Sequence, residues 1–340
     1  MKQRRDTDLD AVRGFAIFLV MLGHCIVLNN MADGIVYDAI KAVQMPLFMM
    51  ISGWLVGRRP LFVTAEEFGR QFGKRAVSCL VPFVSWIFIT NVTDFPGKLL
   101  RVLYQPDTGL WFLLTLFLLS TFLLFALFVR DGLKLGWPGF GIALFLEAGL
   151  LCLHYLSGNT FLGPALTVNY FPFYIGGFLL GCFGERIWKR MGTRPMRGGS
   201  ILCVMGLAAF LFLVLRYDMV YAHSRPEWLL QLLTSALGSS VCFFMIYNCP
   251  DGRLKQFLAW TGKYTLEIYV LHFRFATILG LKDKGLSLYS LQGVCGVTAS
   301  FLLMSVLTAF CIYMFKRLAI TDLLLFGKTT RIHRHYRPIE

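Results

Sequence analysis

Hydrophobic residues in this chain gather in runs of about 20 residues, and most polar residues lie in the short segments between them. A helix needs about 20 mostly apolar residues to cross the hydrocarbon core of a bilayer, so each run predicts one transmembrane helix. The pattern therefore predicts an all-α fold, a polytopic membrane helix bundle of about ten spans. The spans are approximately residues 9–29, 36–57, 74–93, 109–129, 137–156, 165–186, 199–217, 228–248, 262–281 and 288–316.

The composition agrees with a membrane protein. Of the 340 residues, 56% are hydrophobic and 15% are charged, whereas soluble domains contain about 25% charged residues. The formal net charge of +14 would suit a nucleic-acid partner, but the basic residues lie in short loops and at the two ends of the chain. In such places they hold helix ends on the cytoplasmic side. The charge therefore indicates membrane topology, and we expect no nucleic acid as a partner.

The distribution of Lys and Arg predicts the orientation of the spans. If the N-terminus is inside, most loop cations fall on the cytoplasmic side, as the positive-inside rule requires. The outer loops then hold only Lys98, Arg101, Arg216, Arg225, Lys282 and Lys284. Both termini are expected in the cytoplasm. No polar segment is long enough for a soluble domain, so we expect a single transmembrane domain at 1–320 and a basic cytoplasmic tail at 321–340.

The first span carries polar side chains that a plain membrane helix does not need: Asp10, Arg13 and His24. A charge near the bilayer centre costs at least a few kcal/mol and usually marks a site. On a helix His24 falls about 20° from Arg13 and about 16 Å farther along the axis, and Asp10 can form an i,i+3 ion pair with Arg13. Asp10 and Arg13 alone would suit snorkelling at the inner interface. Together with His24 on one stripe, they favour a polar site or channel.

A second polar group lies in the predicted ninth span, within "TGKYTLEIYVLHF" (261–273). His272 is expected about 15 Å deep from the cytoplasmic side, a level comparable with that of His24. Glu267 and His272 differ by about 140° around the helix. We therefore expect that they do not both point into one pocket.

The loop after the second span contains the densest basic cluster of the chain, including Arg58, Arg59, Lys74 and Arg75. A phosphorylated cytosolic ligand would suit these side chains. The positive-inside rule explains them equally well. Both interpretations stay open on the residues alone.

Four stretches resemble the signature segments of the acyltransferase-3 family of integral membrane proteins, in the same order and at the same span positions. They are "LDAVRGFAIFLVMLGH", "MPLFMMISGWL", "LWFLLTLFLL" and "GKYTLEIYVLH". The nearest likeness is to the fucose 4-O-acetylase-like branch, which acts on surface polysaccharides. Two features depart from the family pattern. Lys74 and Arg75 stand where many members carry an Arg-x-x-Arg pair, and Gln44 stands where the branch often has His.

The resemblance implies transfer of an acyl group, usually acetyl, from cytosolic acyl-CoA to a hydroxyl of a cell-surface glycan or its lipid-linked precursor. His24 and Arg13 match the essential His and Arg of the family. By that likeness His24 is the general base, and Arg13 positions the donor or the histidine. An imidazole that removes the proton of an attacking hydroxyl accelerates such a reaction by about 10²–10⁴.

The sequence therefore predicts an O-acyltransferase of the bacterial inner membrane, with acetyl-CoA as the donor substrate and no metal. Its partners are the lipid bilayer, acyl-CoA and a glycan acceptor, and the motifs specify no oligomeric state. The candidate catalytic residues are His24, Arg13, Asp10, His272 and Glu267, and the candidate donor-binding residues are Arg58, Arg59, Lys74 and Arg75. Two alternatives stay open. One is a secondary transporter that exports a glycan precursor or small amphiphile, in which intramembrane His, Glu and Arg relay protons. The other is an acyltransferase with a lipid, peptide or small-metabolite acceptor.

Overall fold

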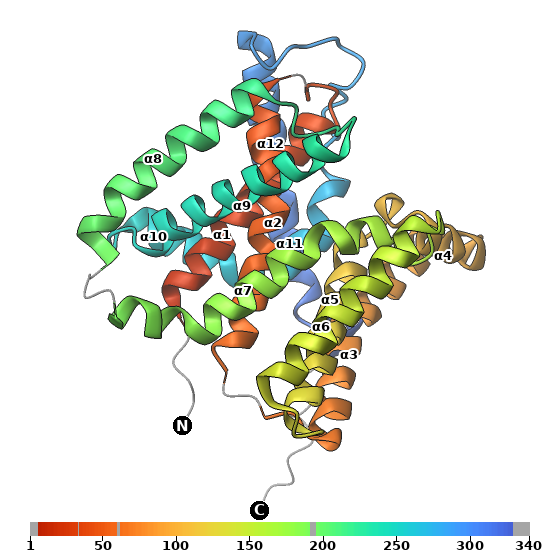
Figure 1. Cartoon of the computed structure of the whole chain (residues 1–340). Helices are drawn as coiled ribbons and strands as arrows, with labels where there is room; N and C mark the ends of the chain where they lie inside the picture. Colours follow the sequence, from red (N-terminus) through yellow and green to blue (C-terminus); the bar gives the residue numbers. More distant parts are fainter. Residues whose placement is uncertain (1–5, 33, 60–61, 191–194, 329–340) are drawn as a thin grey trace, which may run out of the picture. The chain divides into compact units, whose positions relative to one another are not determined.

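The computed structural model of the chain describes residues 6–32, 34–59, 62–190 and 195–328, with the backbone alone at 185–190 and 195–201. In this described part every regular element is a helix (Figure 1), so the predicted all-α fold is confirmed. The elements are α1 (Thr7–Val27), α2 (Ile35–Gly57), α3 (Ala65–Thr90), α4 (Phe95–Tyr104), η1 (Pro106–Thr108), α5 (Trp111–Asp131), α6 (Gly136–Leu156), α7 (Pro164–Arg190), α8 (Pro195–Arg216), α9 (Arg225–Tyr247), α10 (Arg253–Thr261), η2 (Gly262–Tyr264), α11 (Thr265–Leu271), η3 (His272–Arg274), α12 (Leu291–Phe315) and α13 (Ala319–Phe326).

Eight helices among the described residues are long and apolar enough to cross a membrane. They are α1, α2, α3, α5, α6, α7, α9 and α12. The predicted span at 199–217 corresponds to α8, whose described apolar stretch, Leu202–Arg216, is shorter. The chain is an integral multi-pass membrane protein.

The predicted ninth span, 262–281, is wrong as a continuous helix. The helical run begins earlier, with α10, and then breaks into η2, the seven-residue α11, η3 and a series of turns. The hydrophobic pattern could not reveal this break, because the backbone there is hydrogen-bonded by side chains that are distant in the sequence. Asn29 and Ser300 donate hydrogen bonds to the carbonyl of Ala276, at 2.9 and 2.7 Å. Irregular backbone at membrane depth is tolerated where protein surrounds it.

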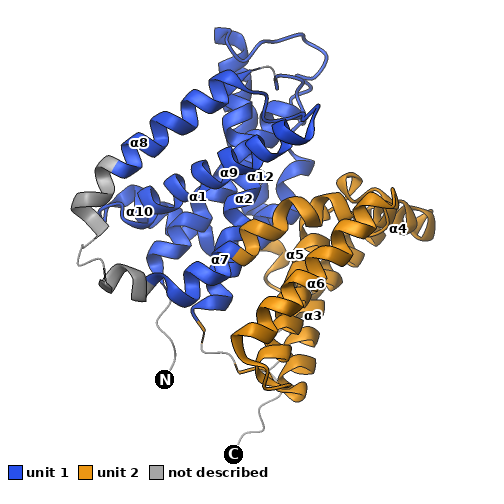
Figure 2. Cartoon of the chain, viewed as in Figure 1, with its two compact units in different colours: residues 1–58, 176–312 blue, residues 59–175, 313–340 orange. Residues whose placement is uncertain are grey.

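The chain forms two compact units (Figure 2), which we describe separately. Unit 1 holds residues 1–58 and 176–312, and unit 2 holds residues 59–175 and 313–340. The helices α7 and α12 each contribute to both units. His24 and His272 both belong to unit 1.

In unit 1, α1 lies against α2, α9 and α10. Asp6 caps α1 by accepting a hydrogen bond from the Leu9 N–H at 3.1 Å, which satisfies one free donor of the first turn. Small residues let α1 and α10 approach closely. A methyl group at Gly14 would lie 1.8 Å from the Leu258 carbonyl oxygen, and one at Gly262 would lie 1.9 Å from that of Asp10. This contact brings the segment that begins with α10 alongside α1.

Glycines also join α2 to α7 in unit 1. A methyl group at Gly177 would lie 2.0 Å from the Met50 carbonyl oxygen, and one at Gly181 would lie 2.5 Å from that of Trp54. Two glycines four residues apart allow the backbones of membrane helices to meet. The helix α2 is therefore held by α1 and also by the part of α7 that belongs to unit 1.

In unit 2, α3 packs against α5 and α13, and α5 packs against α6. The Trp86 indole N–H donates a hydrogen bond to the Leu325 carbonyl at 3.0 Å, which attaches α13 to α3. Gly327 ends α13 in the left-handed conformation, with φ 63°. Part of the tail predicted at 321–340 therefore forms a helix, and residues 329–340 lie outside the described residues.

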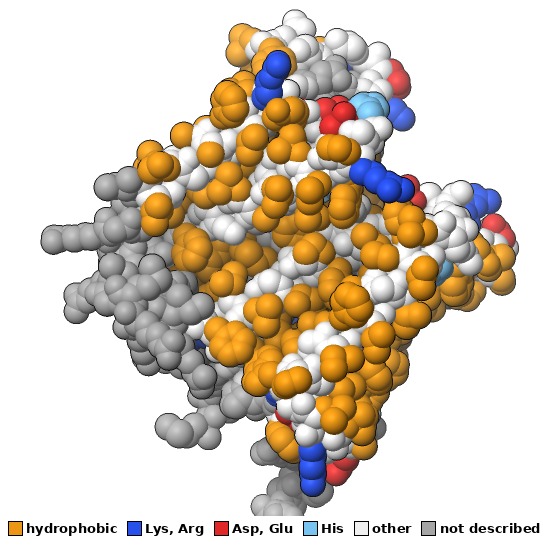
Figure 3. Space-filling model, viewed as in Figure 1, with side chains coloured by type: hydrophobic (Ala, Val, Ile, Leu, Met, Phe, Trp, Pro, Cys, Tyr) orange, Lys and Arg blue, Asp and Glu red, His pale blue; other side chains and the backbone are white. Residues whose placement is uncertain are grey.

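Hydrophobic side chains cover much of the surface of each unit in the face shown in Figure 3. On α6 the outward residues include Phe145 (77% exposed) and Leu150 (67% exposed), and on α12 they include Phe310 (60% exposed). Soluble proteins rarely expose apolar patches of this extent. These faces are suited to lipid.

Candidate active site

The structure brings together the two histidines that the sequence places in separate spans. The ring centroids of His24 on α1 and His272 at the start of η3 are 4.9 Å apart, with the ring planes inclined by 34°. We call these two residues the histidine pair. His272 is 0% exposed, whereas His24 is half-buried. Of the two side chains, only His24 therefore has exposed surface.

Hydrogen bonding defines the tautomer of His272. Its Nδ1 lies 2.7 Å from the Ile268 carbonyl oxygen, which can only accept, so Nδ1 carries the proton and Nε2 of the neutral ring is an acceptor. Both His272 Nε2 and His24 Nδ1 are buried without a hydrogen-bond partner in the described part of the chain. Buried polar atoms are nearly always hydrogen-bonded. Each of these two nitrogens is therefore an exception inside unit 1, with a hydrogen-bonding position that no described residue fills.

The backbone that follows His272 is fastened to two other helices. Asn29, just after α1, donates to the carbonyls of Cys25 at 2.8 Å and Ala276 at 2.9 Å. Ser300 of α12 donates to the same Ala276 carbonyl at 2.7 Å. Phe18 of α1 also packs edge-on against Phe301 of α12, with ring centroids 5.0 Å apart. These contacts hold η3 beside α1 and so keep His272 opposite His24.

The predicted ion pair near the start of α1 is confirmed. Arg13 Nη1 lies 3.6 Å from Asp10 Oδ1, and the side chain of Asp10 is 6% exposed against 32% for Arg13. This pair lies about three to four turns closer to the N-terminus of α1 than His24. Asp10 and Arg13 therefore form a group separate from the histidine pair.

Glu267, the remaining candidate catalytic residue, is 0% exposed on α11, at the turn before His272. Its burial shows that the carboxyl group faces protein rather than lipid. Its catalytic role stays a prediction.

The predicted donor-binding residues are divided between the two units. Arg58 belongs to unit 1, where it forms an ion pair with Asp6, the cap of α1. Arg59, Lys74 and Arg75 belong to unit 2, and Arg59 and Lys74 are exposed. A joint role in holding a phosphorylated donor stays a prediction.

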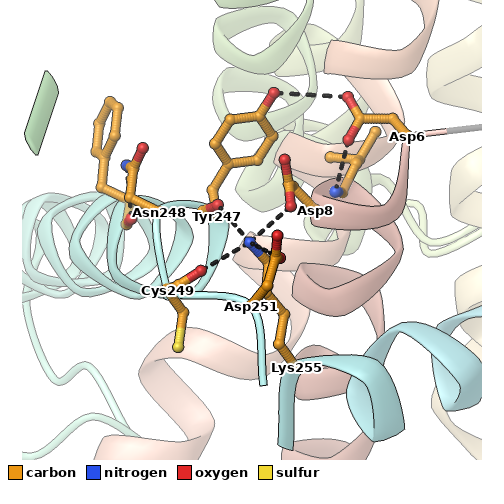
Figure 4. Close-up of polar contacts among 9 residues, drawn as sticks. Asp6, Asp8, Tyr247, Asn248, Cys249, Asp251 and Lys255 are labelled. Carbon is orange, nitrogen blue, oxygen red and sulfur yellow. Dashed lines mark hydrogen bonds and ion pairs between the residues drawn. The ribbon is translucent and has the colours of Figure 1, made fainter. Parts of the chain in front are cut away.

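A polar cluster around Lys255 was not among the sequence-predicted sites (Figure 4). The Lys255 ammonium, only 7% exposed, contacts Asp8 at 2.6 Å, Asp251 at 3.4 Å and the Cys249 carbonyl at 2.7 Å. Burial disfavours the charge of Lys255, but the hydrogen bonds and charges of Asp8 and Asp251 outweigh it and raise the pKa of Lys255 above its ordinary value. The i,i+4 spacing of Asp251 and Lys255 was the only sequence signal of this cluster.

Two polar residues of α2, Lys41 and Gln44, lie on the helix packed beside α1 near Gly23 and were not among the candidate site residues. Gln44 is buried, and a methyl group at Gly23 would lie 2.8 Å from its Oε1 and 3.1 Å from Ile40 Cγ2. Lys41, on the same turn, is half-buried, and its positive charge acts on His24. The sequence signal was the recurrence of polar residues every three positions, at Asp38, Lys41 and Gln44, in an otherwise apolar run.

The family model described as "Acyltransferase domain" matches residues 6–314, nearly the whole chain, and includes both histidines. The chain belongs to this acyltransferase family. It is therefore an acyltransferase enzyme, and the secondary-transporter alternative loses its support.

Two relatives match the acyltransferase over most of its length. A "Nodulation protein NolL" of Sinorhizobium fredii (strain NBRC 101917 / NGR234) is 29% identical, and the match covers 78% of this chain and 77% of the relative. A second "Nodulation protein NolL", of Mesorhizobium japonicum (strain LMG 29417 / CECT 9101 / MAFF 303099), is 24% identical over 83% of this chain and 79% of the relative. No solved structure matches the acyltransferase.

Within the described residues of the acyltransferase, no three His, Cys, Asp or Glu side chains are grouped as metal ligands. The chemistry that the histidine pair can perform is proton transfer. A neutral imidazole takes a proton from a hydroxyl and returns it to a leaving group.

Proposed function

We propose that this acyltransferase moves an acyl group, acetyl in the simplest case, from cytosolic acyl-CoA to a hydroxyl of a cell-surface glycan or its lipid-linked precursor. The histidine pair carries the proposal, because it holds two imidazoles with ring centroids 4.9 Å apart, one fully buried and one half-buried. We place the enzyme in the bacterial inner membrane, with both termini in the cytoplasm.

In the proposed reaction His24 is the general base. The acceptor hydroxyl gives its proton to His24 while its oxygen bonds to the thioester carbonyl carbon, and the carbonyl π electrons move to the carbonyl oxygen. When the carbonyl re-forms, the carbon–sulfur bond breaks and the CoA thiolate takes the proton from the His24 imidazolium. The products are the ester and free CoA, and His24 returns to its neutral form.

His272 orients His24 in this proposal. Because Nδ1–H of His272 points to the Ile268 carbonyl, its Nε2 is available to accept a hydrogen bond from Nδ1–H of His24. That bond would leave Nε2 of His24 unprotonated and ready to act as the base. Hydrogen bonds of this kind often tighten only when substrate is bound. The arrangement follows the logic of a base held in one tautomer by a third group.

The donor is proposed to enter from the cytoplasmic side. CoA carries several phosphates, and in unit 1 Arg13 and Arg58 are the cations proposed to receive them. Arg59, Lys74 and Arg75 of unit 2 stay predicted donor-binding residues. The Asp10 carboxylate holds the guanidinium of Arg13, which we propose positions the donor on the stripe that leads to His24.

Membranes that contain the protein, incubated with radiolabelled acetyl-CoA and a panel of glycan acceptors, test this function. His24→Gln, which removes the base but keeps polarity and approximate size, is expected to lower transfer by about 10²–10⁴. His223→Gln is the matched control, because His223 is exposed in the segment between α8 and α9. Wild-type membranes that label no acceptor with any acyl-CoA donor would contradict the proposed function. Full transfer by His24→Gln would contradict the role of His24 alone.

A further inference from the structure

Lys41 is a charged side chain in the second turn of α2, a helix long and apolar enough to cross the membrane. Within the described residues it forms no hydrogen bond or ion pair. A lysine without a counter-ion inside a membrane segment costs a few kcal/mol, and such residues usually serve a function.

The nearest acidic residue of the same helix is Asp38, one turn earlier. Its carboxylate accepts a hydrogen bond from the Met219 backbone, in the segment between α8 and α9. Asp38 is therefore engaged with that segment, and the charge of Lys41 is left without a local counter-ion.

The packing of α2 against α1 places the turn that carries Lys41 beside Gly23, the residue before His24. The turn of α2 from Ile40 to Gln44 contacts Gly23, the residue before His24. Lys41 is three positions before Gln44, which puts the two side chains about 60° apart on one face of α2. The ammonium and the half-buried imidazole of His24 thus belong to the same region of unit 1, and the two groups interact electrostatically.

Acyl transfer creates a negative charge at a definite place. When the acceptor hydroxyl attacks the thioester, the carbonyl oxygen becomes an oxyanion within a few ångströms of the base. A positive group already held there stabilises this charge more than it stabilises the neutral thioester. Neither imidazole of the pair can supply this charge at the start of the reaction, since His24 must be neutral to act as a base.

We propose that Lys41 is a catalytic residue of this acyltransferase, whose ammonium binds the oxyanion that forms on the acyl carbonyl. The proposal rests on the proposed function, in which His24 acts as the base. It gives a function to a cation that has no counter-ion within the described residues. The base, His24, then comes from α1, and the residue that binds the oxyanion, Lys41, comes from the adjacent helix α2. Lys41 has a second possible use, snorkelling to the nearby end of the span, which would require no contact with the reaction.

Kinetics of Lys41→Met and Lys41→Arg separate the two uses. Met keeps the linear shape without the charge, and we expect its kcat to fall by about 10²–10³ while the KM for the acyl donor stays the same. Arg keeps the charge with a different shape and is expected to retain intermediate activity. Lys284→Met is the matched control, because Lys284 is exposed in the segment before α12. Yield and elution of the detergent-solubilised protein show that each variant folds.

Slow hydrolysis of the acyl donor provides a readout that needs no glycan. Water attacking the same thioester forms the same oxyanion, so loss of both transfer and hydrolysis in Lys41→Met, with Lys284→Met unchanged, would support the proposal. Wild-type kcat in folded Lys41→Met would overturn it and leave the proposed function intact. A wild-type protein that neither transfers nor hydrolyses any acyl-CoA would overturn the proposed donor, and the oxyanion role of Lys41 with it.

Discussion

The side-chain amide of Asn29 and the backbone carbonyl of Ala276 are joined by a hydrogen bond of 2.9 Å. Asn29 follows the helix that carries His24, and Ala276 follows the short helix that begins with His272. The same amide also donates to Cys25, within α1. One side chain therefore ties the two halves of the histidine pair together, although they come from opposite ends of the chain.

Replacement of Asn29 by Ala is expected to lower acyl transfer by about tenfold, which corresponds to about 1.4 kcal/mol. The Ala276 carbonyl would keep Ser300 as a donor, so His272 would be held less firmly rather than released. The measurement is kcat together with thermal stability in detergent. Asn91→Ala is the control, because Asn91 makes the equivalent bond to the carbonyl four residues earlier, Ile87, but belongs to unit 2. A loss of activity no greater than that of Asn91→Ala would contradict the positioning role.

The histidine pair is expected to behave as one catalytic unit. His272→Gln should lower transfer strongly, although His272 itself is fully buried, because it would no longer define the tautomer of His24. The double variant His24→Gln/His272→Gln should be little worse than His24→Gln, since effects of residues that act together are not additive. Transfer rates of the three variants test this. Multiplicative losses would indicate that the two histidines act independently.

Close contact between α1 and α10 is expected to be sensitive to a single methyl group. Gly14→Ala would place a carbon 1.8 Å from the Leu258 carbonyl oxygen, and overpacking of this kind costs about 1–3 kcal/mol, occasionally more. Gly73→Ala on α3 has no neighbour within 4 Å and should instead stabilise its helix by about 0.5–1 kcal/mol. Thermal unfolding in one detergent compares the two variants. Equal stability of Gly14→Ala and wild type would show that α10 moves away without cost.

The buried Lys255 predicts a dependence of stability on alkaline pH. Its pKa is raised in the folded state above the ordinary 10.5, so the stabilisation by Asp8 and Asp251 is fully present below pH 10.5. It is lost as the pH rises through the folded-state pKa. We expect Asp8→Asn to unfold at a lower temperature than wild type at pH 8, and the difference to shrink above pH 10.5. A difference that stays constant to pH 11.5 would assign the effect of Asp8 to its position in the first turn of α1 instead.

Much of this fold follows from hydrophobicity alone. The apolar runs predicted the long helices, and the spacing of Asp10 and Arg13 predicted their ion pair. Both predictions were possible because a helix and an i,i+3 pair depend on residues close in the sequence. His24 and His272 were each recognisable as polar groups in apolar runs. Their contact was not predictable, because it depends on which helices become neighbours, and that is decided by contacts such as the one between Gly14 and the Leu258 backbone.

Lys41 and the break after α10 illustrate what sequence patterns miss. The spacing of Asp38, Lys41 and Gln44 indicates a polar face of this helix, but it does not tell which distant helix that face meets. The stretch at 262–281 has the hydrophobicity of a span, yet side chains from α12 and from the end of α1 replace its helical hydrogen bonds. Both features depend on partners far away in the sequence.

The interrupted segment from α10 to η3 also bears on how the enzyme is made. A helix that satisfies its own backbone can enter the bilayer by itself, whereas short helical pieces need surrounding protein to complete their hydrogen bonds. The segment that carries His272 must therefore find α1 already in the membrane, and Ser300 of α12 is synthesised later still. The active site therefore cannot be complete until α12 has been made, so the growing chain holds no working catalyst while its earlier helices are being inserted.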